Sequence, residues 1–176
     1  ITGCSRKAYL NYLKEMKHLI HDLAAANKEI ILFSSEVQDY ETIEMLYDDF
    51  LKDPQVNVVF VKEKEDLLTL YQSLNLVIGT RMHSMIVAVS QFVPIIGLSW
   101  QQKVVEMFKN LGIEEDVLAI DDLSKKRELL LKKTNEKLAN NDQELIKMRQ
   151  RKEEMRRAFA INYEIIDSLR QHLVNV

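Results

Sequence analysis

The stretch LNLVIGTRMHS at residues 74–84, followed by PIIGLSWQQK at residues 94–103, decides the fold of this chain. In the first stretch, the apolar run Leu-Val-Ile ends in Gly-Thr, and an apolar helical pattern begins just after the His. That order is typical of a strand, a tight turn and the start of a helix. The second stretch predicts another strand, so together they predict consecutive βα units.

The same alternation of strands and helices extends outward over residues 1–122. The apolar periodicity predicts helices at 6–26, 43–51, 64–73, 83–91 and 103–111, and strands at 29–34, 56–61, 75–80, 94–99 and 117–120. Because such alternation is typical of right-handed βαβ units, we expect an α/β, Rossmann-like domain. Its single, mainly parallel sheet should have about five or six strands flanked by helices.

Residues 123–176 form a tail of different composition, with no Gly or Pro from Ser124 onward. We expect two helices, broken near residues 139–141, where Asn141 and Glu144 have the spacing of a capping box. The chain therefore divides into a Rossmann-like domain at 1–122 and a long helical tail at 123–176.

The second helix of the tail carries a seam of residues that recur alternately after three and four positions. Its members are Leu145, Met148, Lys152, Met155, Phe159, Asn162, Ile166, Leu169 and Leu173. A seam of this kind packs on a partner surface. We expect that surface to be this domain or a neighbouring domain, and a homo-oligomer formed by a coiled coil of tails is the alternative.

Composition excludes several classes of protein. The 176 residues are 47% apolar and 29% charged, as in ordinary globular domains. The net charge of −3 and the lack of a basic stripe with interleaved aromatic residues argue against a nucleic-acid partner. A single cysteine, Cys4, allows no internal disulfide and suits a reducing compartment.

The sequence also predicts a location and a context. No apolar run approaches the ~18 residues of a membrane span and no signal peptide opens the chain, so we expect a cytoplasmic protein. The opening ITGCS resembles the end of a strand followed by a helix N-cap. We therefore expect the chain to be part of a longer protein.

Three basic residues lie where the predicted strands end: Arg81 and His83 after one strand, and Lys103 after the next. Ligands bind at the carboxyl edge of an open α/β sheet, and a helix N-terminus favours an anion. A histidine side chain can both accept and donate a proton, so His83 suits proton transfer. We expect an anion site here, with the β-carbons of His83 and Lys103 within roughly 12 Å of each other.

Each of these residues also has a simpler explanation. His83 could cap its helix or satisfy a structural partner, Arg81 could tie down a loop through a carboxylate, and Lys103 could be a solvated residue. Lys103 fits its place poorly, since a cation at a helix N-terminus opposes the dipole unless an anion lies there. The convergence of all three favours a functional site.

The loop at 34–40 is expected at the same edge of the sheet. Its acidic residues Glu36 and Asp39 would meet a sugar, act as a base or remain solvated. The other histidines, His18, His21 and His172, match no ligand spacing, so we expect no metal site.

Several motifs together resemble the signature of the polysaccharide pyruvyl transferases. They are VIGTRMHS at 77–84, the apolar helix after it, VPIIGLS at 93–99 and Lys103. Similarity extends to the LYQSLNLVIGTRMH stretch at 70–83, the NLGI turn at 110–113 and the charged helical tail. The resemblance covers the carboxyl-terminal half of that family, and it implies a domain like the carboxyl-terminal domain of GT-B glycosyltransferases.

Members of this family transfer the pyruvyl group of phosphoenolpyruvate onto two sugar hydroxyls as a ketal. Residue by residue, the resemblance implies that His83 is catalytic and that Arg81 and Lys103 bind phosphoenolpyruvate. Thr80 and Ser84 of the same motif are expected beside them. Phosphoenolpyruvate is then the donor substrate, and no cofactor is expected.

The resemblance also implies partners. The acceptor is expected to be a sugar of a cell-surface polysaccharide or exopolysaccharide, or its precursor, met in the cytoplasm or at the inner face of the membrane. A further basic residue of the family lies in its amino-terminal domain and has no counterpart here. That missing domain is therefore expected to complete the site.

Two other readings of the chain remain open. A GT-B glycosyltransferase or related sugar-nucleotide enzyme would have the same rhythm of strands and helices, and nucleotide binding would distinguish it. A non-catalytic scaffold domain of the same fold would use the tail for assembly and would not need His83 or Lys103.

Overall fold

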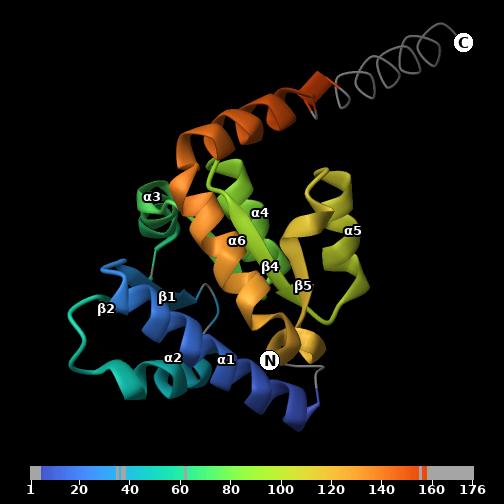
Figure 1. Cartoon of the computed structure of the whole chain (residues 1–176). Coiled ribbons are helices and arrows are strands. Elements are labelled where there is room, and N and C mark those ends of the chain that lie inside the picture. Colours follow the sequence, from blue (N-terminus) through green and yellow to red (C-terminus); the bar gives the residue numbers. More distant parts are fainter. Residues whose placement is uncertain (1–4, 35, 37–38, 62, 155, 158–176) are drawn as a thin grey trace, which may run out of the picture.

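The computed structural model describes residues 5–34, 36, 39–61, 63–154 and 156–157 (Figure 1). It contains two small parallel sheets flanked by helices. One sheet pairs β1 (Ile30–Ser34) with β2 (Val56–Phe60), and the other has the order β3 (Val77–Gly79), β4 (Ile95–Ser99) and β5 (Val117–Ala119). The five strands lie where the apolar runs predicted them.

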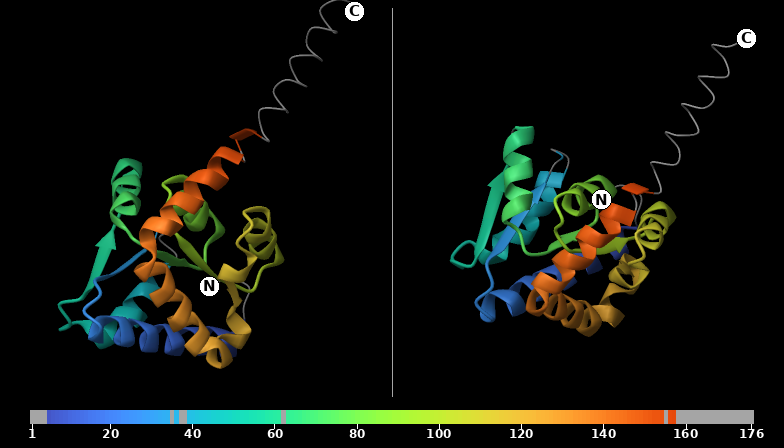
Figure 2. Two further views of the ribbon diagram at one scale, coloured as in Figure 1. Left: turned by 45° about the horizontal axis from the view of Figure 1, so that its top comes forward. Right: turned by 90° about the horizontal axis from the view of Figure 1, so that it is seen from above.

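The expectation of one continuous sheet is wrong, because β1 and β3 are not joined by a ladder of hydrogen bonds. Residues of both strands line the same two cavities, of about 140 and 280 Å³. The two sheets nevertheless lie side by side (Figures 1 and 2). The finding supports a mixed α/β fold with parallel strands, and a specific likeness to GT-B domains stays a prediction.

Within the described residues the predicted helices are present, and their ends are shifted by at most four residues. They are α1 (Arg6–Ala25), α2 (Tyr40–Tyr47), α3 (Lys64–Ser73), α4 (Met82–Ser90), α5 (Gln102–Asn110) and α6 (Arg127–Ala139), with 3₁₀ turns η2 (Asp48–Phe50), η3 (Glu114–Asp116) and η4 (Ile120–Lys126). Residues 141–154 form a further helix. The helix predicted at 43–51 begins earlier and ends in η2, because its last residues adopt the tighter turn that often closes a helix.

The core lies on both faces of the three-stranded sheet. Every residue of β4 is buried, and neighbouring residues on a strand point to opposite faces. Ile95 packs in a cluster with residues of α3, α4 and α5, whereas Ile96 packs in a cluster with residues of α1, η4 and α6. The continuous apolar run of this strand is therefore explained by helices on both of its sides.

Helix α1 supports both sheets. Ser5 caps it by accepting a hydrogen bond from the Ala8 N–H at 3.2 Å. Its apolar face contacts β1 and also η4, which lies about a hundred residues later in the chain. At its other end, Asp22 accepts a hydrogen bond from Arg127 of α6 at 3.0 Å.

The tail turns sharply after α6, and the helix at 141–154 runs in a new direction (Figure 2). The capping box expected there is not formed. The Asn141 side chain donates instead to the Asn75 carbonyl oxygen at 2.7 Å, and Glu144 forms ion pairs with Lys137 and Lys147. Both side chains satisfy partners outside the first turn, so they do not cap it.

The described part of the seam packs on the same domain. Met148 is buried in the cluster that contains Ile95, and the Lys152 Nζ lies 4.3 Å from the ring centroid of Phe92. Met155, Phe159, Asn162, Ile166, Leu169 and Leu173 lie outside the described residues. The division into 1–122 and 123–176 and an oligomer through the tail remain predictions.

Candidate active site at the carboxyl ends of the strands

Parallel pairing places the ends of β3 and β4 next to each other, with Gly79 opposite Gly97. The chain leaves β3 toward α4 and leaves β4 toward α5. The first turns of these two helices therefore start from neighbouring strand ends; Figure 1 shows the two helices with β4. This is the edge at which open α/β sheets bind ligands.

Arg81 is the residue just before α4, and its guanidinium is already paired. Its Nε donates to Asp39 Oδ2 at 2.8 Å, and its Nη2 donates to Asp39 Oδ1 at 2.6 Å. Its Nη1 lies 3.6 Å from Oε2 of Glu36. The hydrogen bonds to Asp39 raise the pKa of Arg81, which stays charged. The structure therefore shows the carboxylate contact that was the simpler explanation for Arg81.

Asp39 lies in the loop after β1, and Ser34, the last residue of that strand, contacts its carboxylate. The Ser34 Oγ accepts from the Glu36 N–H at 3.0 Å, and its one proton is shared between the Glu36 carbonyl oxygen at 3.1 Å and Asp39 Oδ2 at 3.3 Å. Since β1 and β3 belong to different sheets, the pair of Arg81 and Asp39 joins the carboxyl ends of the two sheets.

A cavity of about 140 Å³ lies beside this pair. Three of the predicted site residues, Thr80, Arg81 and Ser84, contribute to its wall, together with Asp39 and apolar residues of α1, β1 and α2. Burial and the nearby charge of Asp39 raise the pKa of Tyr12, which also lines the cavity. Tyr12 therefore remains a neutral phenol.

Ser84 forms a hydrogen bond with Tyr71, a residue that the sequence did not indicate as part of the site. Its Oγ lies 2.5 Å from the hydroxyl of Tyr71, which is fully buried and stacks edge-on against Phe33 at 5.4 Å. Burial raises the pKa of Tyr71, and the hydrogen bond with Ser84 opposes that effect only in part. The signal was present, since Tyr71 lies in the LYQSLN stretch that leads into the motif.

His83 and Lys103 are exposed in the first turns of α4 and α5, and neither contributes to the wall of this cavity. Their helices begin at neighbouring strand ends, as the sequence predicted. The Ser99 Oγ accepts from the Gln101 N–H at 2.9 Å and so shapes the turn before α5. The separation of roughly 12 Å between the two β-carbons stays a prediction.

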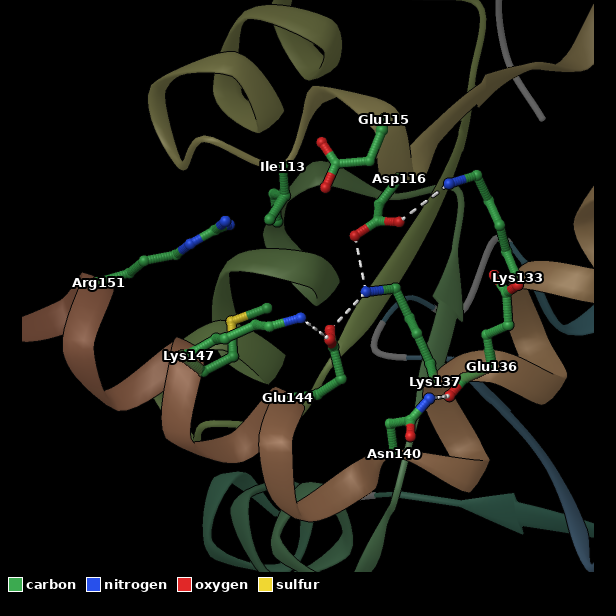
Figure 3. A pocket seen from close by; sticks show the side chains of 11 residues that line it. Ile113, Glu115, Asp116, Lys133, Glu136, Lys137, Asn140, Glu144, Lys147 and Arg151 are labelled. Carbon is green, nitrogen blue, oxygen red and sulfur yellow. Dashed lines mark hydrogen bonds and ion pairs between the residues drawn. The ribbon is translucent and has the colours of Figure 1, made fainter.

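A second group of charged residues, away from the strand ends, joins the tail to η3 (Figure 3). The Lys137 Nζ lies 2.7 Å from Asp116 and 2.8 Å from Glu144, Lys133 lies 3.4 Å from Asp116, and Lys147 lies 2.7 Å from Glu144. These side chains line a cavity of about 350 Å³. We call them the tail cluster.

The tail cluster pairs three lysines with two carboxylates, so its two acidic groups are fully surrounded by positive charge. Burial lowers the pKa of Lys137, but its bonds to Asp116 and Glu144 outweigh this effect and raise it. Burial raises the pKa of Glu144, and its bonds to Lys137 and Lys147 outweigh this and lower it. Both groups are therefore held in their charged forms, as in a structural ion-pair network.

Two general features of the described residues bear on the kind of site. Over the ranges that the structure describes, no group of three His, Cys, Asp or Glu side chains is arranged to hold a metal ion. In the same ranges, no helix combines the length and apolar character needed to cross a bilayer.

The sequence was compared with known proteins. Residues 3–102, more than half of the chain, match the family model described as polysaccharide pyruvyl transferase. The matched segment contains Asp39, Thr80, Arg81, His83 and Ser84, and it ends one residue before Lys103. No curated protein and no solved structure matches the chain.

Proposed function

Because the chain belongs to the polysaccharide pyruvyl transferase family, we propose that it serves to transfer the pyruvyl group of phosphoenolpyruvate to a polysaccharide. The product is a ketal on a sugar of a cell-surface polysaccharide or exopolysaccharide. The observation that carries this proposal is the grouping of Thr80, Arg81 and Ser84 around one cavity, with His83 and Lys103 on helices that begin at the neighbouring strand ends.

The residue types suit an anionic donor. Phosphoenolpyruvate carries a phosphate and a carboxylate, which cations and the free N–H groups of a helix N-terminus stabilise. In our proposal, Arg81 and Lys103 bind these two groups, and the hydroxyls of Thr80 and Ser84 donate to the same anion. The function of these cations is to position the donor and to stabilise the charge that develops as phosphate leaves.

The proposed reaction has a balanced sequence of steps. A proton is added to the methylene carbon of the donor, which becomes a methyl group, and two sugar hydroxyls form bonds to the carbon that carried the phosphate. The bond from that carbon to the phosphate oxygen breaks, and inorganic phosphate leaves. The two sugar hydroxyls release two protons. One of them replaces the proton that was added to the methylene carbon, and the other leaves with the phosphate.

We assign His83 as the group that supplies the proton to the methylene carbon. An imidazole has an ordinary pKa near neutrality and can deliver a proton and recover it from a hydroxyl in each turnover. Its exposure at the start of α4 leaves it accessible to substrate. The enzyme is thus a transferase with phosphoenolpyruvate as its donor and no cofactor.

The acceptor and the cellular setting are part of the same proposal. We propose that the acceptor is a sugar of a polysaccharide or of its lipid-linked precursor, met in the cytoplasm or at the inner face of the membrane. An amino-terminal domain supplies the facing side of the site, since donor and acceptor must be held between two surfaces for efficient transfer.

The direct test is to mix the chain, and a longer form carrying the preceding domain, with phosphoenolpyruvate and a polymeric or lipid-linked sugar acceptor. Release of phosphate that depends on the acceptor, with a ketal methyl signal in the NMR spectrum of the product, would support the proposal. We expect the chain alone to bind the donor weakly without turnover. Transfer from a sugar nucleotide instead would identify a glycosyltransferase, and binding without any transfer by the longer form would identify a scaffold.

A further inference from the structure

The guanidinium of Arg81 contacts two carboxylates of the protein itself. Asp39 occupies its Nε and Nη2 in a bidentate pair at 2.8 and 2.6 Å, and Glu36 lies 3.6 Å from the remaining Nη1. The forked edge of an arginine is also the edge that binds a phosphate or carboxylate in two-bond geometry. The protein itself therefore fills the place that an anionic donor would take.

The net charge around Arg81 also opposes the binding of an anionic donor. One positive charge faces two carboxylates, so the group of Arg81, Asp39 and Glu36 carries a net charge of −1. The side chain of Asp39 is only 16% exposed and that of Arg81 30% exposed, so water screens the group incompletely. A phosphate approaching this group in its present form would be repelled.

We propose that Asp39 acts as an internal competitor for the donor, and that binding exchanges its carboxylate for the phosphate or carboxylate of phosphoenolpyruvate at Arg81. The proposal rests on the proposed function, because it takes Arg81 as a donor ligand. Asp39 thus sets the affinity for the donor without touching it. The residue is a tuning residue of the site and takes no part in the chemistry.

Two details of the structure make the exchange feasible. The Ser34 Oγ lies 3.1 Å from the Glu36 carbonyl oxygen and 3.3 Å from Asp39 Oδ2, so its one proton is available to the carboxylate after Arg81 turns away. The partial exposure of Arg81 lets an anion reach it from solvent. The exchange therefore replaces one charge-assisted pair with another, and neither partner is left buried without a bond.

The test compares the binding of phosphoenolpyruvate, and of inorganic phosphate as a simpler probe, by calorimetric titration of four forms of the chain. Asp39→Asn keeps the shape and an acceptor oxygen but removes the competing charge, so both anions should bind roughly five- to tenfold more tightly. Glu36→Gln should tighten binding less, because Glu36 makes only the longer contact. Glu41→Gln, at an exposed position in the first turn of α2, is the matched control and should bind as the unaltered chain does.

The result that overturns the proposal is unchanged or weaker binding of both anions by Asp39→Asn, which would show that Asp39 only positions Arg81. If phosphate binding tightens but phosphoenolpyruvate is never turned over by the longer protein, the competitor role stands and the proposed function fails. If Asp39→Asn does not fold, the NMR signal of the Arg81 Nε–H in the unaltered chain provides the answer. It should shift in saturable fashion with either anion, and an unmoved signal would contradict the exchange.

Discussion

Gly97 in β4 lies so close to Phe108 of α5 that a β-carbon built on it would be 2.6 Å from Cζ and 2.8 Å from Cε2 of that ring. Real side chains do not approach so closely, and Phe108 is fully buried. The absence of a side chain at Gly97 therefore lets α5 pack directly on the sheet. Lys103 lies in the first turn of α5, so this contact also positions Lys103 in the proposed site.

We predict that Gly97→Ala lowers the free energy of unfolding by about 1–3 kcal/mol, since the ring must move within a packed core. Urea unfolding followed by circular dichroism measures this change. Gly79→Ala is the matched control, because its β-carbon would lie 3.1 Å from Cγ of Met85, less close than the contact at Gly97, and the loss should be smaller. Equal losses for the two variants would argue against the tight contact of α5.

The proposed roles of His83 and Lys103 predict different kinetic defects in the longer protein. His83→Ala should lower kcat by ~10² or more, because a general acid acts in the transition state. Lys103→Ala should mainly raise KM for phosphoenolpyruvate, since a positioning cation contributes to the ground state and the transition state alike. Steady-state rates of phosphate release measure both, and nearly normal activity in both variants would mean that the site lies elsewhere.

The tail cluster predicts a large effect from one buried charge. Lys137→Met should lower the free energy of unfolding by about 2–3 kcal/mol. This is less than the roughly 3–5 kcal/mol for a fully unpaired buried charge, because Lys133 and Lys147 still face Asp116 and Glu144. Lys132→Met, on the exposed side of α6, is the control; the Lys132 Nζ lies 3.8 Å from Glu136, and this exposed pair should contribute less than about 1 kcal/mol. A loss as small as that of the control would show that the cluster contributes little.

The same cluster predicts how stability depends on pH. The pKa of Glu144 is lowered from 4.5, so its contribution is present above that value and is lost as the pH falls through the folded pKa. The pKa of Lys137 is raised above 10.5, so its contribution is present below that value and is lost as the pH rises through the folded pKa. The cluster should therefore stabilise the fold most between about pH 5 and 10.

Urea unfolding between about pH 3 and 7 tests the acid side of this range. Glu144→Gln should flatten the fall in stability at low pH, but only in part, because the hydrogen bond from Arg127 also lowers the pKa of Asp22. Glu128→Gln, at an exposed position of α6, should leave the profile unchanged. An acid limb identical in both variants would contradict the role of Glu144.

The sequence predicted the strands and helices well because apolar periodicity is a local property. The buried run PIIGLS and the helix after His83 could each be recognised from their own residues. The break between β1 and β3 could not, because hydrogen bonding between two distant strands leaves no mark in either of them.

For the candidate site, the sequence predicted that β3 and β4 end side by side, and their parallel pairing confirms this arrangement. The roles of the residues at these strand ends stay predictions. The pairing of Arg81 with Asp39 spans 42 residues, and the sequence could offer it only as one explanation of Arg81 among others. The tail cluster was missed because Lys and Glu are abundant in the tail, and no pattern indicates which of them are buried.

The position of α1 has a consequence for the order in which the chain can fold during synthesis. This helix is the first described element to leave the ribosome. Much of its apolar face is covered by η4, and Asp22 forms its hydrogen bond with Arg127, which lies 105 residues later in the chain. Its neighbour β1 can pack on it early, but the remaining face stays open until η4 and Arg127 emerge. Until η4 and the start of α6 have been synthesised, the nascent chain therefore presents an uncovered apolar stripe, the kind of surface that chaperones bind.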